Sequence, residues 1–164
     1  MPDLLTHTLV GFTIGTVLSW RIDWAERHYV TAVMVGAVVP DLVKVKLLVP
    51  SAQVADSLGM PFSWLPLHTL GGAALSVLMI GTLVARESHR RRALLMIATG
   101  ALSHLILDGL LRTPTGRGGP VFWPVTAYQP PTPGLYLSTD PWPAGLAVAI
   151  AGVVVYGDRR VVSA

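Results

Sequence analysis

Residues 93–111 read ALLMIATGALSHLILDGLL, an apolar run whose only ionisable side chains are His104 and Asp108. A helix needs about 20 mostly apolar residues to cross the hydrocarbon core of a bilayer. This run meets that length, and it follows a cluster of arginines, as helices that end at a membrane surface often do. The stretch therefore predicts a transmembrane helix.

Four further apolar runs lie outward from this one along the chain. Residues 29–49 and 67–85 also meet the spanning length, residues 4–20 are at its short limit, and residues 143–157 span only with help from their neighbours. The chain is 52% hydrophobic and only 13% charged, with a mean hydropathy of +0.58, so it carries about half the charge of a soluble domain. We predict an all-α fold, a polytopic integral membrane bundle of four or five transmembrane helices in one domain, residues 1–164.

The basic residues predict the orientation of this bundle. Most of the twelve Lys and Arg residues lie in the connections 21–28 and 86–92 and in the C-terminal tail. With five spans these segments share one side, and the positive-inside rule then places the N-terminus outside and the C-terminus in the cytoplasm of a cell-membrane protein. Because the net charge of +3 is spread between apolar runs, it does not indicate a nucleic-acid partner.

Two connections fall on the predicted outer side. Residues 50–66 are expected to form a loop of moderate length. Residues 113–141 are rich in Pro and Gly, which excludes a regular helix there. The aromatic side chains within this second connection suit an interfacial belt that covers the helix ends, and they are Phe122, Trp123, Tyr128 and Tyr136.

Ionisable residues are rare in the apolar runs, and each one needs a partner, because an Asp at the centre of a membrane helix costs about 2.5–3.5 kcal/mol. His104 and Asp108 are four residues apart, so they share one helix face. Since successive runs cross in opposite directions, residues from four runs fall at a similar depth near the outer face. The candidates at this depth are Asp3, His7, Asp41, His68, His104 and Asp108.

This residue set favours a metal ion. Imidazole and carboxylate without thiolate suit zinc, manganese or iron, and the chain has no cysteine. We predict a divalent ion, zinc or manganese, with ligands drawn from His7, Asp41, His68, His104 and Asp108. One of the two carboxylates, Asp41 or Asp108, could instead act as the general base that accepts a proton from metal-bound water. Lys44, one turn from Asp41, either reaches the outer interface or holds a substrate phosphate, whereas His28 and His89 lie beside charged residues and are expected to be solvated.

Two other interpretations stay open at this point. The His and Asp side chains are alternatively a non-catalytic set of hydrogen-bonding groups that holds the bundle together. Intramembrane Asp and His also mark ion pathways, so a small transporter or proton relay is a third interpretation. That one requires polar residues toward the cytoplasmic side, and the runs 4–20, 67–85 and 93–111 offer few of them.

At these same residues the chain resembles the YdjM-like family of membrane-bound metal-dependent hydrolases. The similarity covers most of residues 1–125, and its most specific part is a Ser-His-x-x-x-Asp piece followed by Phe-Trp-Pro. The matching pieces occur in family order at residues 6–7 (TH), 36–41 (GAVVPD), 67–69 (LHT), 103–108 (SHLILD) and 121–124 (VFWP).

The resemblance implies a multi-pass hydrolase with a His/Asp metal site at His7, Asp41, His68, His104 and Asp108. Family members often have a further Asp and His after Pro-Asp, where this chain has Val43 and Lys44, and a His-Arg-Gly approach to the third-run His, where it has Ser63, Trp64 and Leu65. These differences remove ligands for a second metal, so we expect a mononuclear site. Its expected substrate is a lipid or another amphiphilic ester or phosphoester reached from the bilayer.

Overall fold

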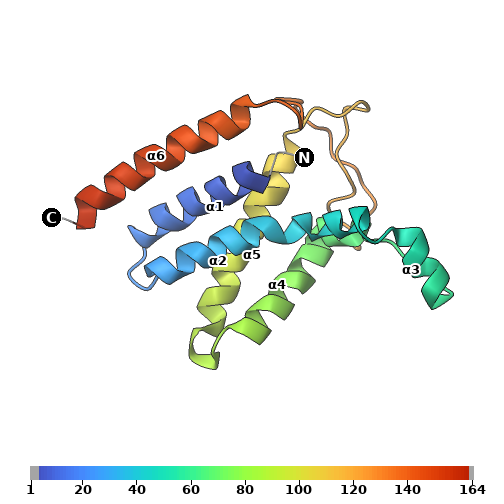
Figure 1. Cartoon of the computed structure of the whole chain (residues 1–164), viewed down its shortest axis with the longest axis horizontal. Coiled ribbons are helices and arrows are strands. Elements are labelled where there is room, and N and C mark those ends of the chain that lie inside the picture. Colours follow the sequence, from blue (N-terminus) through green and yellow to red (C-terminus); the bar gives the residue numbers. More distant parts are fainter. Residues whose placement is uncertain (1–3, 163–164) are drawn as a thin grey trace.

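The computed structural model describes residues 4–162, with side chains through Arg159. Every regular element in this range is a helix, which confirms the predicted all-α class, and Figure 1 shows their arrangement. Five helices are α-helices of twelve residues or more: α1 (Leu4–Ser19), α2 (Arg27–Val38), α4 (Leu70–Val84), α5 (Arg90–Gly109) and α6 (Trp142–Val162). The shorter elements are η1 (Val39–Leu47), α3 (Ser51–Leu58), η2 (Leu65–His68) and η3 (Glu87–His89).

Helix α2 lies at the centre, with α1 and α5 packed against it, α6 packed on α1 and α4 packed on α5 (Figure 1). Glycines bring α2 and α5 into backbone contact. A Cβ atom on Gly100 would lie 2.0 Å from the carbonyl oxygen of Val33, and one on Gly36 would lie 2.0 Å from that of Ile97. Small residues of this kind allow close approach of membrane helices, whose association gains little from the hydrophobic effect.

The prediction of one continuous helix over residues 29–49 is wrong. Helix α2 ends at Val38, and the chain continues as the 3-10 helix η1. The N–H of Val39 already bonds to the carbonyl of Gly36, and Pro40 has no N–H with which to continue the α-helical pattern. Asp41 therefore lies in the first turn of a tighter helix that begins inside the apolar run.

The start of the run 67–85 also differs from the prediction. Helix α4 begins at Leu70, and the side chain of Thr69 caps it by accepting a hydrogen bond from the N–H of Gly72 at 3.2 Å. His68 consequently lies in the preceding 3-10 turn η2, which starts beside Pro66. This places the imidazole in a bend of the chain and not on a regular helix face.

The connection 50–66 is not the plain loop that we predicted, since it contains helix α3. This helix ends at Gly59, which has a positive φ of 65°, a conformation that glycine adopts without strain. None of its residues is buried, so α3 contributes nothing to the core.

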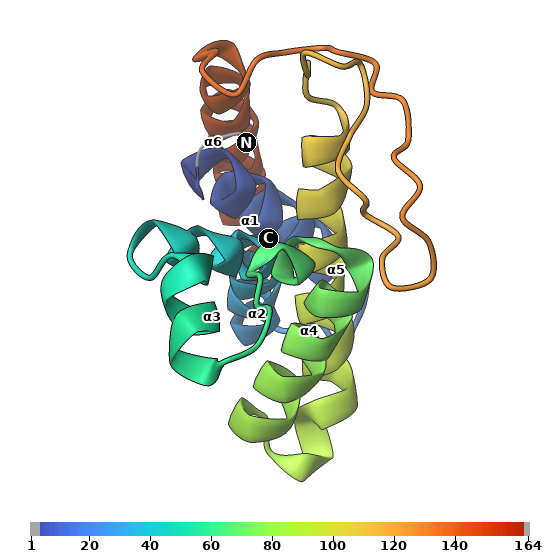
Figure 2. The same ribbon diagram turned by 90° about the vertical axis from the view of Figure 1, so that its right-hand side faces the viewer.

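The connection 113–141 contains no regular helix, as predicted. It runs beside α5 and reaches the start of α4 (Figure 2). Two of its carbonyl groups accept hydrogen bonds from the first turn of α4: Val121 from the N–H of Leu70 at 2.7 Å, and Trp123 from the N–H of Gly71 at 3.2 Å. These N–H groups have no partner within their own helix. The connection therefore fixes the end of α4 that adjoins His68.

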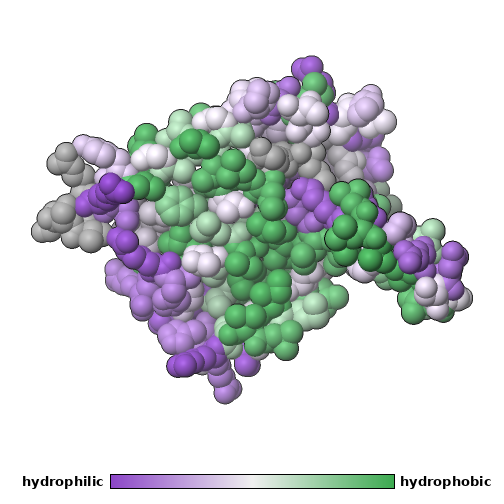
Figure 3. All heavy atoms as spheres, in the orientation of Figure 1, coloured by the Kyte–Doolittle hydropathy of each residue, from purple (hydrophilic) through white to green (hydrophobic). Residues whose placement is uncertain are grey.

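Within the described residues, one helical stretch, Glu87–Gly109, is both long and apolar enough to cross a membrane. The helices Leu4–Ser19 and Leu70–Val84 are apolar but shorter. Figure 3 shows apolar atoms over the middle of this face, with hydrophilic atoms gathered along the left and lower-left edge, over the turn between α1 and α2 and the turn between α4 and α5.

Candidate metal centre

The fold brings together all five residues that were predicted as ligands. Four segments supply them: α1 carries His7, η1 carries Asp41, η2 carries His68, and α5 carries both His104 and Asp108. His7 and His104 are completely buried, with exposed fractions of 0%. The sixth candidate, Asp3, lies outside the described residues.

Asp108 is at the centre of this cluster because three imidazoles approach its carboxylate. The Nε2 atom of His68 lies 2.9 Å from Oδ2, that of His104 lies 3.6 Å from Oδ2, and that of His7 lies 3.4 Å from Oδ1. The rings of His7 and His104 are stacked, with centroids 3.7 Å apart. The i,i+4 spacing of His104 and Asp108 thus produces the shared face that the sequence predicts.

Asp41 has a different environment. Its Oδ2 atom accepts a 2.6 Å hydrogen bond from the ammonium of Lys44, whose side chain is 38% exposed. Its Oδ1 atom lies 3.9 Å from Nε2 of His104 and has no hydrogen-bond partner among the described residues. One oxygen of Asp41 is therefore fixed by a cation, and the other one is left free beside the cluster.

Main-chain carbonyls orient two of the three histidines. The Nδ1 atom of His104 lies 2.7 Å from the carbonyl oxygen of Ala37, and that of His68 lies 3.2 Å from the carbonyl oxygen of Pro40. A carbonyl can only accept, so each Nδ1 carries the proton, and in the neutral ring Nε2 then presents a lone pair. In a 3-10 helix the carbonyl of Ala37 would accept a hydrogen bond from the N–H of residue 40. Residue 40 is Pro40, which has no N–H, so the carbonyl is available to His104.

Imidazole nitrogens and carboxylate oxygens therefore face one another across the buried cluster. Six of these buried atoms have no hydrogen-bond partner within the described part of the chain: Nδ1 and Nε2 of His7, Nε2 of His104, Oδ1 of Asp41, and both carboxylate oxygens of Asp108. Unpaired buried polar atoms are costly, and a cation among them would offset that cost. This donor set fits a metal ion.

Two groups of donor atoms each lie within 4.8 Å of one another: His7, His104 and Asp108 form one, and Asp41, His68 and His104 form the other. They share His104. The five residues can therefore hold an ion, while their chemistry, nitrogen and carboxylate oxygen, is common to several divalent metals.

A cavity of about 230 Å³ opens beside this cluster. His68 and Asp108 form part of its wall, and the rest comes mainly from the connection 113–141, including Gly118, Gly119 and Thr132. The connection that was expected to cover the helix ends thus encloses a space that reaches the candidate ligands.

Tyr136 is a site residue that the sequence did not single out beyond its aromatic character. Its hydroxyl donates a 2.6 Å hydrogen bond to the carbonyl of Leu107, one residue before Asp108. Burial, together with the negative charge of Asp108, raises the pKa of Tyr136 to about 12, so the hydroxyl stays protonated and keeps donating. No sequence signal separates Tyr136 from the other aromatic residues of the connection.

The remaining histidines lie elsewhere. The Nδ1 atom of His89 lies 3.1 Å from the hydroxyl of Tyr29, and His28, which is more than half exposed, lies 3.5 Å from Glu26. Both belong to the opposite ends of α2 and α5 from Asp41 and His104. Neither joins the cluster.

The fold and the cluster define an all-helical protein with a buried His/Asp group that could hold a metal ion. The sequence model of one family, the YdjM inner membrane protein, matches residues 1–164, the whole chain. The chain belongs to this family of inner membrane proteins, which confirms the resemblance and the membrane location. No curated protein and no solved structure matches it.

Proposed function

We propose that this chain is a multi-pass, metal-dependent hydrolase of the membrane, with one divalent ion held near the outer face. The observation that carries the proposal is the convergence of His7, His68 and His104 on Asp108, in a buried cluster where several nitrogen and oxygen atoms of His7, His104 and Asp108 have no hydrogen-bond partner among the described residues. The ligand set favours zinc or manganese. The substrate class is a lipid or another amphiphilic ester or phosphoester.

The surface supports the multi-pass arrangement. Large apolar side chains are exposed on the outward faces of the helices, as Leu75 at 67%, Leu83 at 80% and Val153 at 71% illustrate. Soluble domains seldom expose contiguous apolar surface of that extent. Helices α1 and α4 are shorter than a full span. The apolar residue Trp20 follows α1, Leu67 precedes α4, and η1 continues the apolar run of α2 to Leu47. A bundle of five spans, with the arginine-rich ends in the cytoplasm, is the topology we propose.

Each carboxylate has a distinct role in this proposal. Asp108 faces three imidazoles, so we assign it as a ligand. Asp41 faces one imidazole and keeps Oδ1 free, so it is the carboxylate that can accept a proton from water. The bound ion would supply a Lewis acid that activates water and polarises a carbonyl or phosphoryl oxygen. Lys44 holds Asp41 in position through Oδ2.

The cavity beside His68 and Asp108 supports the substrate class. At about 230 Å³ it suits the polar head of an amphiphile better than the whole molecule, since sites for complete small ligands are usually about 300–1,000 Å³. Its wall belongs to the connection at the predicted outer surface, where a headgroup lies. The apolar part of such a substrate would stay in the bilayer.

A purely structural role for the cluster is less well supported. Side chains that hold membrane helices together do so by hydrogen bonds, which contribute about 0.6 kcal/mol each on average. Here only His68 approaches the carboxylate of Asp108 at 2.9 Å, whereas Nε2 of His7 lies at 3.4 Å and Nε2 of His104 at 3.6 Å, and neither of these two nitrogens has a hydrogen-bond partner among the described residues. A set of groups that served only as hydrogen-bonding partners would be expected to pair.

Added metal is expected to stabilise the detergent-solubilised protein. Ligands must be unprotonated imidazole and carboxylate, so the gain should be present at neutral pH and lost as the pH falls through the usual histidine range near 6.5. Linkage gives a gain of about 2.7 kcal/mol when the free metal is a hundred times its dissociation constant. Thermal unfolding with Zn²⁺, with Mn²⁺ and with chelator, at pH 7.5 and pH 5, measures it.

The matched variant for this experiment is Asp41→Asn, which preserves shape and removes one charge. In the proposed roles it should retain the metal-dependent stabilisation and lose hydrolysis of a dispersed phospholipid or short-chain ester. Equal unfolding temperatures with metal and with chelator in the unmodified protein would contradict the proposal and leave the structural interpretation.

Cysteine labelling is expected to verify the topology. Because the chain has no native cysteine, single cysteines at Ser51, Thr132 and Ser88 report one position each. In intact cells a membrane-impermeant maleimide should modify Ser51→Cys and Thr132→Cys and spare Ser88→Cys. Modification of position 88 alone would invert the orientation and put the metal site on the cytoplasmic side.

A further inference from the structure

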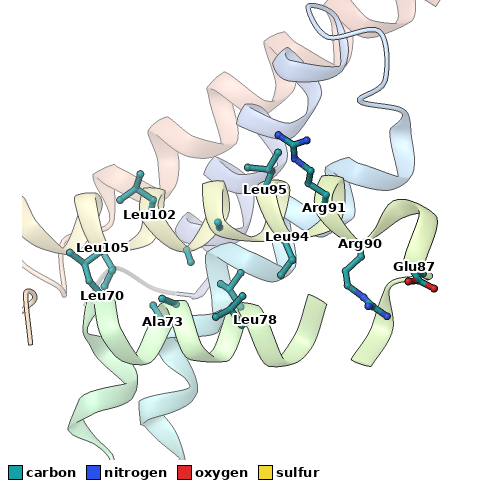
Figure 4. Close-up of a pocket in the computed structure, with 14 residues that line it drawn as sticks. Leu70, Ala73, Leu78, Glu87, Arg90, Arg91, Leu94, Leu95, Leu102 and Leu105 are labelled. Carbon is teal, nitrogen blue, oxygen red and sulfur yellow. The ribbon is translucent and has the colours of Figure 1, made fainter. Parts of the chain in front are cut away.

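The largest cavity among those described is a groove between α4 and α5 (Figure 4), and only its apolar end approaches the His/Asp cluster. Its volume is about 760 Å³, and its walls are apolar side chains of both helices, including Val77, Leu94 and Ala98. Leu70 and Leu105 lie at one end, and Glu87, Arg90 and Arg91 lie at the other. The groove is therefore apolar along its length and charged at one end.

The charged end contains an unpaired N–H donor. The Nε atom of Arg90 is buried and has no hydrogen-bond partner within the described residues. Arg91 adds a second positive charge at the same end, and Glu87 a single negative one. Arginine presents its donors in a planar fork that matches phosphate oxygens. The end of the groove thus offers an excess of positive charge and one unpaired buried donor to an anion.

We propose that this groove is a binding site for an anionic phospholipid, with the phosphate at Arg90 and Arg91 and an acyl chain along α4 and α5. From Arg91 to Leu105 the helix rises about 21 Å, which exceeds the roughly 15 Å depth of one leaflet of the hydrocarbon core. The charged end lies at the end of α5 away from His104, whereas the apolar end reaches Leu105 beside His104, so the phosphate position is separate from the proposed hydrolytic centre. It rests on the membrane location and not on catalysis.

Charge complementarity selects this occupant over a partner helix. A second protein helix with an apolar face would cover the apolar walls, and it would leave the buried Nε of Arg90 without a partner. Anionic lipids are concentrated in the cytoplasmic leaflet and attract basic groups near the membrane surface. A phospholipid satisfies both ends of the groove at once.

Native mass spectrometry of the full-length protein in detergent tests the site, with phosphatidylglycerol and phosphatidylcholine added in turn. We expect the unmodified protein to retain phosphatidylglycerol in preference to phosphatidylcholine. The variant Arg90→Gln/Arg91→Gln should bind phosphatidylglycerol at least about tenfold more weakly, equivalent to about 1.4 kcal/mol. Its matched control is Arg21→Gln/Arg27→Gln, which removes the same charge from the same side of the bundle and should bind as the unmodified protein does.

A second pair of variants tests the apolar part. Ala98→Phe fills the groove from an exposed position on α5 and should also weaken retention, whereas Ala149→Phe, exposed on α6, should not. Equal retention of the two lipids, or equal binding by the groove variants and their controls, would overturn the proposal. A dimer that dissociates in Ala98→Phe would also overturn it, because it would make a second copy the occupant. His104→Ala should leave lipid retention intact, so failure of the hydrolase proposal is separable from failure of this one.

Discussion

In the proposed metal centre, replacing His104 with alanine is expected to release the ion and abolish the proposed hydrolysis. His104 belongs to both groups of donor atoms in the cluster, so its removal leaves neither group complete. The loss of affinity should exceed the roughly 10–100-fold that removal of a partner behind a metal ligand usually costs. Metal content after gel filtration in detergent, measured by elemental analysis, gives the result directly.

The control for this variant is His89→Ala. His89 also adjoins α5, but it lies at the other end of the helix, beside Tyr29, and its loss should leave metal content and hydrolysis unchanged. Helix α5 itself should persist in His104→Ala, since Leu105, Ile106 and Leu107 still favour its insertion. Full metal content in a folded His104→Ala protein would show that the ligand assignment is wrong.

The second large effect is expected at Gly100. A Cβ atom there would lie 2.0 Å from the carbonyl oxygen of Val33, which is backbone and cannot rotate away. Gly100→Ala therefore has to move α5 away from α2, and overpacking of this kind costs about 1–3 kcal/mol and occasionally more. Because His104 is one turn further along α5, the same movement lengthens its hydrogen bond to the Ala37 carbonyl and weakens metal binding.

Gly152→Ala is the matched change for that experiment. Gly152 lies in α6, and a Cβ atom there would meet nothing within 4 Å, so the substitution should raise stability by up to about 1 kcal/mol through helix propensity alone. Thermal unfolding in detergent, followed by circular dichroism, compares the two variants. A Gly100→Ala protein as stable as Gly152→Ala would mean that α2 and α5 do not pack as closely as the structure has them.

The convergence of the candidate ligands was largely predictable from two features of the sequence, the apolar runs and the expected alternation of their directions. The apolar runs predicted a helix near each candidate residue, although not the residue at which each helix begins, and the assumption that successive runs alternate in direction predicted which residues lie together. His7 and Asp108 illustrate this, since they are about a hundred residues apart and lie within 3.4 Å of each other. The sequence could therefore predict the convergence without any knowledge of the packing.

The sequence could not predict how the side chains are held. Hydropathy does not distinguish α2 from η1, so the run 29–49 gives no sign that the helix changes at Val38, and Pro40 alone is compatible with a kink in a continuous helix. The short helix α3 was missed because eight residues offer too few turns for a reliable pattern. Tyr136 was not distinguished because its role depends on a return of the chain to α5 that no local pattern encodes.

The change from α2 to η1 has a consequence for how substitutions in this chain should be interpreted. The groups that set the tautomers of His104 and His68 are the carbonyl oxygens at positions 37 and 40, and every amino acid possesses such an oxygen. Replacing a side chain there cannot delete the acceptor and can only redirect the backbone that carries it. A scan of side-chain substitutions would therefore underestimate the importance of these two hydrogen bonds. A shift of the backbone between positions 37 and 40 would change the orientation of both histidines together.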